Sequence, residues 1–409
     1  MRFLFIAAGS AATVFGIAPL ATAVRNAGHE VFVAANDNVM ASVAGVGLPG
    51  VPVTPVPLFD FITKDRAGAP VAVPDGIDEG AFFTGGWFAR MAVAQLDRLL
   101  EFTAHRPPDV VVGGTLCYAA PLLAARFGVP WVRHAWDAID ATGADPGAEQ
   151  ELAAELRELG LDGLPEPDLF IDVCPPGIRP PHAADALLMR WIPVNNQRPL
   201  EPWMYAKAKD DGRPRVCLTA GSRVTHDAAD DGRLFLADMV KALSLPDVEL
   251  LVAAPDAVAA GLRADFPDVR AGWMPLDVLA PSCDLVVHHG GGTTALTALR
   301  SSVPQLILPK GALSVRGARA LADYGAALAL ESRDADPAAV ADAARELLHN
   351  PGYRTRAGEL AAEIAALPAP PDLLDTLTGL VDTPTGLVNT RTALVDTPTG
   401  PVRPRDGAR

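Results

Sequence analysis

The residues best suited to chemistry lie in one run, residues 284–300, which reads DLVVHHGGGTTALTALR. An apolar strand pattern ends at a histidine pair, then three glycines and two threonines lead into a helical pattern. Glycines let a backbone approach a ligand closely, and a helix start offers N–H groups and partial positive charge. Thr293 or Thr294 would cap the helix and present a hydroxyl. The run predicts a pyrophosphate cradle, with a tight structural turn as the alternative.

A carboxylate occupies a comparable place in the first half of the chain. Asp137 ends the run WVRHAWD, just past a predicted strand. Ligands bind beyond the carboxyl ends of parallel strands, so this position favours a role in a site. Trp136 beside it would raise the basicity of the carboxylate by limiting water. Asp137 is therefore a candidate general base, with a helix N-cap as its alternative, and Asp140 and His134 compete for the role.

Short apolar runs alternate with helical patterns to about residue 370, which is typical of parallel sheets covered by helices. The strands are expected at residues 2–7, 30–34, 51–53, 110–113, 129–133, 169–172, 215–218, 248–253, 269–272, 285–288 and 305–308. The helices are expected near residues 15–26, 82–105, 118–127, 148–159, 230–243, 257–265, 293–300, 318–322, 335–349 and 360–367. Residues 58–78, rich in Pro, Gly and charge, predict a long loop over one end of the first sheet.

The chain has 409 residues, which exceeds one ordinary core, because single cores stop growing at about 250–300 residues. Prolines and polar residues between the two α/β series indicate a linker. We expect a first domain over residues 1–200, a linker over 201–214 and a second domain over 215–370. Residues 371–409 are expected to form a closing segment and a tail. The tail repeats DTPTGLV-like heptads, which favours disorder over a docking role.

The composition limits the classes of molecule that the chain is expected to bind. The net charge of −15 argues against nucleic acid or an anionic membrane. The first residues suit a strand–loop–helix–strand unit better than a signal peptide, and no run of ~18 apolar residues is present, so a cytoplasmic protein is expected. The scattered cysteines favour buried thiols over disulfides or zinc. No metal motif is apparent, since the cluster of Asp227, Asp230 and Asp231 reads as solvated.

The runs GWMPL, APSCD and HHGGGTT at residues 272–294 resemble the donor signature of GT-B glycosyltransferases. The chain is similar to bacterial members that glycosylate polyketide natural products, and the likeness extends to about residue 370. This resemblance implies an α/β fold with two facing Rossmann-like parallel-sheet domains and a cleft between them. The first would bind the acceptor and the second the nucleotide sugar. It also implies a metal-independent transfer with a dTDP-deoxysugar as co-substrate and no cofactor.

The resemblance assigns roles on the donor side. Trp273 would stack on the nucleobase, with a buried core tryptophan as the alternative. His289 would hydrogen-bond the diphosphate, and the backbone of residues 290–294 would donate to it. The turn TAGSR at residues 219–223 would face the phosphates, where Arg223 adds charge or is merely solvated. The expected nucleotide-sugar-binding residues are Gly221, Ser222, Arg223, Trp273, Met274, His289, Gly290, Gly291, Gly292, Thr293 and Thr294.

The chain departs from the family pattern at three positions. Thr13 stands where many relatives have a general-base histidine, and a threonine hydroxyl cannot take a proton near neutral pH. Leu313 and Ser314 stand where many relatives have an Asp–Gln pair that binds sugar hydroxyls. An apolar side chain there would leave a hydroxyl unpaired, which favours a deoxygenated sugar. Thr293 replaces another glycine.

The strings DLFIDVCPP, PLEPWMY and ADYGAA resemble glycosyltransferases of angucycline-type aromatic polyketides, including those that form C-glycosides with dTDP-D-olivose. Removing a phenolic proton from such an acceptor makes a neighbouring ring carbon nucleophilic. Asp137 is the candidate base, and Ser10 would hydrogen-bond the acceptor or sugar, with turn chemistry as its alternative. Phe83 and Trp87 would share a helix face with Arg90 and suit a flat acceptor, with core packing as the alternative. The expected acceptor-binding residues are Thr13, Phe83, Trp87 and His134.

Other functions compete with this one. They are an O-glycosyltransferase of the same pathway type, a nucleotide-sugar epimerase and a non-catalytic partner protein. A dinucleotide-dependent oxidoreductase is disfavoured, because the GSAA turn after the first strand lacks the GxGxxG spacing. The sequence leaves open the acceptor, the sugar, the linkage, the number of transfers and whether the chain forms a homodimer.

Overall fold

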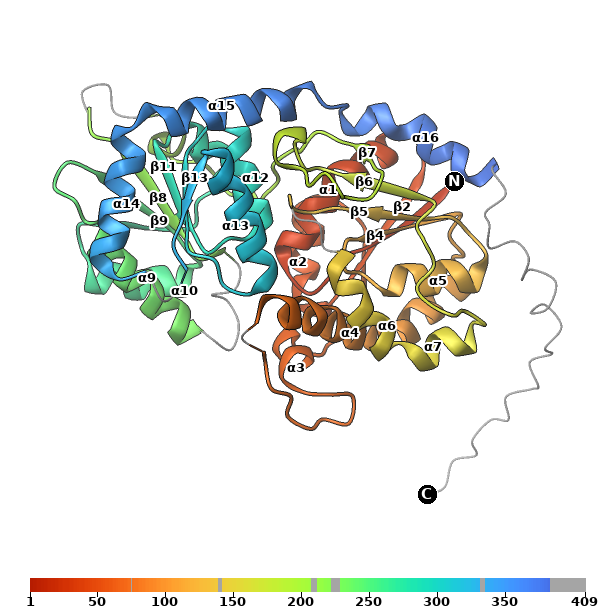
Figure 1. Cartoon of the computed structure of the whole chain (residues 1–409). Coiled ribbons are helices and arrows are strands. Elements are labelled where there is room, and N and C mark those ends of the chain that lie inside the picture. The colour runs from red at the N-terminus through yellow and green to blue at the C-terminus, as the bar shows by residue number, and fades with distance from the viewer. Residues whose placement is uncertain (75, 139–141, 207–211, 222–228, 332–334, 383–409) are drawn as a thin grey trace, which may run out of the picture.

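A computed structural model of the chain describes residues 1–74, 76–138, 142–206, 212–221, 229–331 and 335–382. Its strands form two sheets, one in each half of the chain, and every strand pair is parallel (Figure 1). The seven-stranded sheet has the order β3-β2-β1-β4-β5-β6-β7, and the six-stranded sheet has the order β10-β9-β8-β11-β12-β13. In each sheet the order reverses beside its first strand, where doubly wound sheets form their ligand crevices.

The strands predicted from sequence are confirmed to within about two residues. The first sheet contains β1 (Arg2–Ile6), β2 (Glu30–Ala35), β3 (Gly50–Pro52), β4 (Val110–Gly114), β5 (Trp131–His134), β6 (Leu169–Asp172) and β7 (Leu187–Leu188). The second contains β8 (Arg215–Thr219), β9 (Glu249–Ala253), β10 (Arg270–Gly272), β11 (Leu285–His288), β12 (Gln305–Ile307) and β13 (Ala327–Ala329). The unpredicted strands, β7 and β13, are short edge strands whose length is too small to show a period.

The helices cover both faces of each sheet. The first domain has α1 (Ala11–Asn26), α2 (Met40–Gly45), α3 (Leu58–Thr63), α4 (Ile77–His105), α5 (Ala119–Phe127), α6 (Asp145–Glu151) and α7 (Ala153–Glu158). The remaining helices are α8 (Pro202–Tyr205), α9 (Ala229–Leu243), α10 (Asp256–Asp265), α11 (Leu276–Leu279), α12 (Gly292–Arg300), α13 (Ala312–Tyr324), α14 (Pro337–His349), α15 (Pro351–Ala366) and α16 (Leu374–Gly379).

Several predictions outside the strands are corrected. The helices expected near residues 318–322 and 360–367 begin earlier, at Ala312 and Pro351. The expected loop over residues 58–78 begins with α3, because Phe61 is buried in the core beside β1 and anchors a helical turn there. The single helix expected over residues 148–159 is two, α6 and α7, which meet at the buried Leu152.

Burial on both faces explains why the strands read as continuous apolar runs. In β1, Phe3 and Phe5 point into one core cluster, whereas Leu4 and Ile6 point into the other. Successive strand side chains alternate between faces, so a strand with helices on both sides needs apolar residues throughout.

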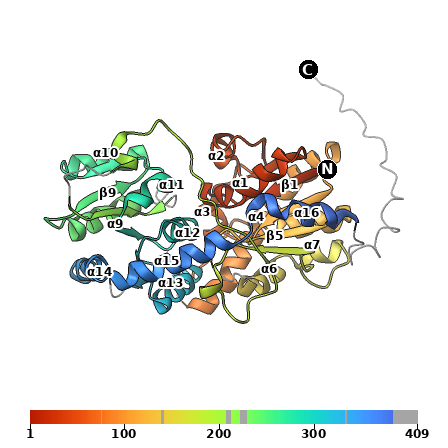
Figure 2. The same ribbon diagram turned by 90° about the horizontal axis from the view of Figure 1, so that it is seen from above.

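The end of the chain crosses from the second domain back to the first. Helix α15 leads from α14 to a 3₁₀ turn, η6 (Pro370–Leu373), and then to α16, as Figure 2 shows from above. Leu373 and Leu377 are buried in the cluster that contains Phe3. The N–H of Arg190 donates to the carbonyl oxygen of Pro368 at 2.8 Å. The C-terminal helices therefore tie the two domains together.

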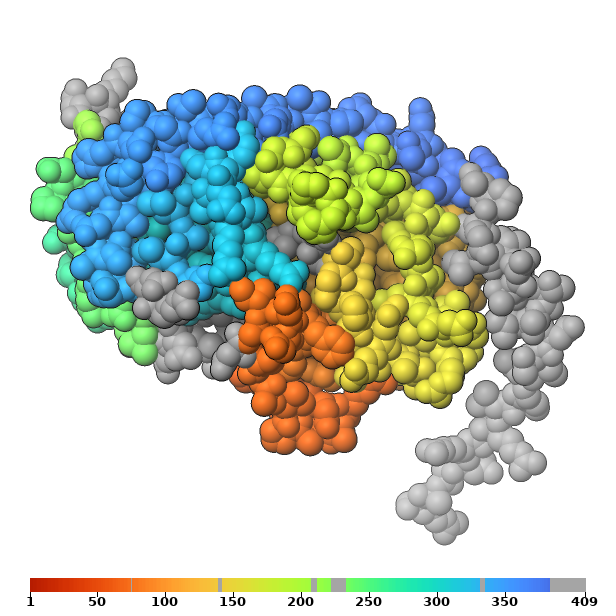
Figure 3. Space-filling model, in the orientation of Figure 1, coloured from red at the N-terminus to blue at the C-terminus, as the bar shows by residue number. Residues whose placement is uncertain are grey.

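The domains also meet where the start of α4 faces α13. A Cβ on Gly80 would lie 2.8 Å from the Cβ of Ala312, and Arg316 pairs with Asp78 at 2.7 Å. In Figure 3 this contact is the place where the orange surface of α4 meets the cyan surface of α13. It brings the start of α13 against the acceptor side of the molecule.

Helices α4 and α6 approach each other so closely that glycine is needed on both. A Cβ on Gly85 would lie 1.8 Å from the carbonyl oxygen of Ala144, and one on Gly147 would lie 1.9 Å from that of Phe82. This crossing fixes the segment that leads from β5 into α6.

Within the described residues, no helix is long and apolar enough to cross a membrane. The four cysteines, Cys117, Cys174, Cys217 and Cys283, are all buried free thiols, as predicted.

Gly147→Ala should lower the melting temperature, because the new Cβ collides with the main chain of Phe82. Overpacking of this kind costs about 1–3 kcal/mol. The matched control is Gly358→Ala in α15, where a Cβ would meet nothing within 4 Å and helix propensity should stabilise by up to about 1 kcal/mol. Thermal unfolding of both variants measures the difference. A rise in melting temperature for Gly147→Ala would contradict the packing argument.

Candidate active site

The glycine run lies beyond the carboxyl end of β11, where the phosphate cradle was expected. Gly290 has φ +87°, a conformation that side chains rarely adopt. Helix α12 begins at Gly292, with Gly291 at its N-cap. The prediction that Thr293 or Thr294 caps this helix is therefore wrong, because both lie within its first turn. Since Gly291 has no side chain, the N-cap residue supplies no oxygen to the first N–H groups, which suits a ligand anion.

His288 fixes the conformation of this glycine loop through a hydrogen bond from Gly290. Sequence reasoning missed this role. The Nδ1 of His288 accepts from the N–H of Gly290 at 3.1 Å, and its Nε2 lies 2.8 Å from Oε1 of Gln305. This network assigns the proton to Nε2. Burial lowers the pKa of His288 to about 4, although the Gln305 hydrogen bond opposes that shift. His288 is therefore neutral at pH 7, and its inward position follows from the strand period of β11.

His289 lies where two loops converge. A Cβ on Gly221 would be 2.5 Å from Cε1 of His289, and one on Gly291 would be 2.8 Å from its Nε2. The loops meet because β8 and β11 are hydrogen-bonded neighbours. The structure thus brings Gly221 and His289 together, as expected for a shared phosphate site. Ser222, Arg223 and Asp227 lie outside the described residues, as do the side chains of Asp230 and Asp231.

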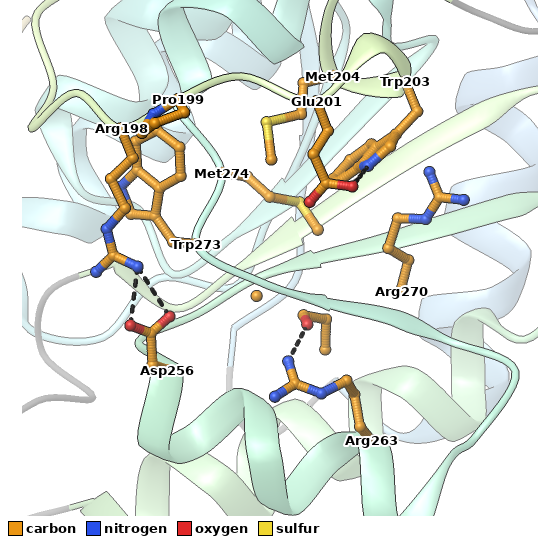
Figure 4. A pocket seen from close by; sticks show the side chains of 12 residues that line it. Arg198, Pro199, Glu201, Trp203, Met204, Asp256, Arg263, Arg270, Trp273 and Met274 are labelled. Atoms are coloured by element: carbon orange, nitrogen blue, oxygen red, sulfur yellow. Dashed lines mark hydrogen bonds and ion pairs between the residues drawn. The ribbon is translucent and has the colours of Figure 1, made fainter.

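Trp273 follows β10 and is partly exposed, lining a cavity of about 480 Å³ (Figure 4). The guanidinium of Arg198 lies 5.3 Å from the centre of its ring. Asp256 holds that guanidinium through contacts of 2.8 and 3.0 Å. Met274 is buried behind the tryptophan. An aromatic face that lines a cavity can stack on a flat ligand, which a core tryptophan cannot do.

The first loop of the acceptor side carries Thr13 and Ser10. Thr13 is buried, and its hydroxyl donates to the carbonyl oxygen of Ser10 at 2.8 Å. This hydroxyl is therefore committed to the main chain. Ser10 is the N-cap residue of α1, yet its side chain makes no capping hydrogen bond. The hydroxyl of Ser10 therefore does not cap the helix, which is one form of the turn chemistry considered for it.

Asp137 lies on the loop after β5 and directly against the donor side. A Cβ on Gly292 would lie 1.9 Å from the Cβ of Asp137. The preceding Trp136 is buried between α1 and β4, because Cβ atoms on Gly16 and Gly114 would lie 2.7 and 2.1 Å from its side chain. The candidate base and the candidate cradle, far apart in sequence, are therefore neighbours. Asp140 lies outside the described residues.

The aromatic residues of α4 form a partly exposed group. Trp87 stacks on Phe88 with ring centres 3.7 Å apart. The guanidinium of Arg90 lies 5.9 Å from the ring centre of Phe83, so these two side chains share a face as predicted. Arg90 itself is buried and donates to the carbonyl oxygen of Phe61 at 3.0 Å. Phe83 and Trp87 keep some accessible surface, whereas Arg90 holds α4 to α3.

His134 has no accessible surface, so in this structure an acceptor has nothing of it to touch. Neither ring nitrogen has a hydrogen-bond partner among the residues that the structure describes. Burial lowers the pKa of His134 to about 4, so the ring is neutral at pH 7.

Sequence reasoning also missed the ion pair that brackets the Asp137 loop. Arg133, at the end of β5, and Asp145, at the start of α6, make two contacts of 2.7 Å. The hydroxyl of Tyr118 donates to Oδ1 of Asp145 at 2.9 Å. Bidentate pairs of this kind fix geometry as well as charge, so they hold both ends of the loop. Among the described residues, no group of three or more His, Cys, Asp or Glu side chains could hold a metal ion.

Comparisons with known proteins identify the family of the chain. The chain matches the N-terminal domain of erythromycin biosynthesis protein CIII-like proteins over residues 76–221 and their C-terminal domain over residues 237–380. It is 34% identical to an L-demethylnoviosyl transferase of Streptomyces niveus, over 90% of this chain and 96% of that one. It is 31% identical to the elloramycin glycosyltransferase ElmGT of Streptomyces olivaceus, over 94% and 99% of the two chains.

Two solved structures superpose over nearly the whole chain. SsfS6 of Streptomyces sp. SF2575, complexed with thymidine diphosphate, gives a TM-score of 0.80 at 33% identity, over 92% of this chain and 99% of that one. The spinosyn rhamnosyltransferase SpnG, complexed with spinosyn aglycone, gives 0.80 at 29%, over 92% and 100%. The chain belongs to the EryCIII-like family of GT-B glycosyltransferases. It is a deoxysugar glycosyltransferase of the kind that serves actinomycete antibiotic pathways.

His134→Leu should reduce the fall in the free energy of unfolding that accompanies a fall in pH. A histidine that is neutral in the folded chain and has a higher pKa when unfolded loses stability as pH falls from about 6.5 to about 4. The variant removes that loss, on the order of 2–3 kcal/mol, and should cost little stability at pH 7, because the ring lies in an apolar surrounding and has no side-chain partner among the described residues. Chemical unfolding at pH 7 and pH 4.5 measures it, with the exposed His105→Gln as control. Equal acid losses in wild type and His134→Leu would refute the assignment.

Proposed function

We propose that this glycosyltransferase moves D-olivose from dTDP-D-olivose to an angucycline-like aromatic polyketide, with inversion, and forms a C-glycoside. The observation that carries the proposal is the position of Asp137 against the start of α12. A base on the acceptor side and an anion cradle on the donor side then flank one reacting centre.

The donor half of the proposal rests on three features. The uncapped start of α12 would stabilise the charge of the leaving diphosphate, with no metal needed. His289 lies between Gly221 and Gly291, beside that helix start. Trp273 offers an aromatic face in a cavity. SsfS6 and SpnG have both been crystallised with thymidine diphosphate, which favours a thymidine nucleotide here.

The preference for a deoxysugar rests on the start of α13. Leu313 is partly buried and packs against the acceptor-domain core that contains Phe88 and Trp136. The neighbouring Ser314 is buried, and a Cβ on Gly290 would lie 3.1 Å from its Cβ. An apolar and a small side chain at these positions offer few hydrogen bonds to sugar hydroxyls. A sugar with fewer hydroxyls therefore gives up fewer hydrogen bonds to water when it binds.

Asp137 would remove the proton of a phenol on the acceptor. The negative charge spreads to the ring carbon beside the phenol, and this carbon attacks the anomeric carbon from the face opposite the diphosphate. The anomeric C–O bond breaks, and the dTDP leaves with the electron pair. Loss of the proton on the attacked ring carbon restores aromaticity. Thr13 cannot serve as the base, since a neutral hydroxyl does not take up a proton near neutral pH.

An O-glycoside is the second candidate, because the same base and donor site would activate a phenol oxygen directly. Product linkage separates the two. The full chain is incubated with dTDP-D-olivose and an angucycline aglycone, with and without EDTA. The expected product keeps its sugar in hot acid and shows a carbon–carbon bond between sugar and ring by NMR. An acid-labile product would establish O-linkage, and loss of turnover in EDTA would contradict the metal-independent proposal.

Asp137→Asn should lower kcat by at least about 100-fold, because an amide cannot accept the phenolic proton. Thymidine diphosphate should bind the variant as it binds the wild type, since the cradle is intact. Steady-state kinetics and calorimetric titration measure the two quantities. Asp97→Asn, on the exposed face of α4, is the charge-matched control and should remain fully active. Turnover near the wild-type value in Asp137→Asn would rule out this base.

A further inference from the structure

We propose that Gly292 is a positioning residue: the missing side chain at the first residue of α12 makes the room in which Asp137 is seated when the two domains close. This inference rests on the proposed role of Asp137 as the base. It assigns to Gly292 a function that differs from close approach to phosphate.

Backbone conformation does not explain the glycine. Among residues 290–292 only Gly290 has a positive φ. Gly292 is the first residue of a helix and does not have a positive φ, so its backbone would accept an alanine. The requirement is therefore for space, and the space is taken by Asp137.

The contact involves atoms that cannot turn away. A Cβ on residue 292 would lie 1.9 Å from the Cβ and 2.9 Å from the Cα of Asp137. Rotation about χ1 of Asp137 moves neither atom. An alanine at position 292 can be accommodated only if the Asp137 loop or the whole of α12 shifts.

The described residues beside Asp137 are packed tightly into the first domain. Trp136 is wedged between Gly16 and Gly114, each of which would clash with it if it carried a Cβ. The Arg133–Asp145 pair closes the loop with two contacts of 2.7 Å. A Cβ on residue 292 should therefore push the donor domain outward and part the cradle from the base.

Because of this contact, the position of Asp137 relative to the start of α12 depends on how closely the two domains approach each other. The loop belongs to the acceptor domain, whereas Gly292 belongs to the donor domain. A displacement of about 1 Å between reacting groups can cost 100-fold in rate, even where each half-site stays intact.

Gly292→Ala should lower kcat by about tenfold to 100-fold and weaken the binding of thymidine diphosphate by a smaller factor, because position 292 would serve the nucleotide site through its main-chain N–H, which alanine keeps. Small-angle X-ray scattering of the nucleotide complex should give a larger radius of gyration than wild type. The control is Gly358→Ala, a helical glycine with open space around it, which should match wild type in both. If Gly292→Ala weakens nucleotide binding as much as it lowers kcat, or changes neither kcat nor the radius, the proposal fails.

A double variant tests the contact without using turnover. Asp137→Gly removes the Cβ that would lie 1.9 Å from the Cβ of residue 292 and leaves only the Cα at 2.9 Å, so adding Gly292→Ala to it should increase the radius of gyration by less than Gly292→Ala does alone. An increase equal to that of Gly292→Ala alone would overturn the seating. Scattering does not report on the base, so this result is independent of the Asp137→Asn test. Full activity of Asp137→Asn would show that Asp137 is not the base, but the steric contact could still be measured.

Discussion

The two domains meet where Asp137 lies against Gly292, and the proposed site depends on this steric constraint. The contact needs the carboxyl ends of β5 and β11 to face one another, which the two parallel sheets provide. It also needs a fixed distance between the domains, which the α4–α13 contact and the C-terminal crossing of η6 and α16 set. Elements distant from the site thus decide its geometry.

The two sides of this contact are stiffened by different physical means. On the donor side, the buried and neutral His288 holds the glycine loop through Gly290. On the acceptor side, close packing around Trp136 and the Arg133–Asp145 ion pair hold the loop that carries Asp137. The proposed cradle at the start of α12 relies on main-chain N–H groups, so the proposal is compatible with a net charge of −15.

Sequence reasoning succeeded where the signal is local. The buried strands were predicted because apolar runs on two-faced strands are continuous, and His289 and the glycine loop stood out as a motif. It failed where tertiary packing overrides local signals: Phe61 turns part of a Pro- and Gly-rich stretch into α3, and Gly291 rather than a threonine precedes α12. The role of His288 was missed because nothing in its own segment reveals that Gln305 faces it.

The sequence by itself determined the two parallel sheets, the family and the residue types on each side of the reaction, because these follow from short periodic patterns and motifs. Only the tertiary structure decided which of those residues meet. Asp137 lies in the first domain and Gly292 lies well inside the second, with the linker between them. No spacing rule relates the two residues. Their contact arises because two separate sheets pack side by side, and the space for it exists because residue 292 carries a hydrogen in place of a side chain.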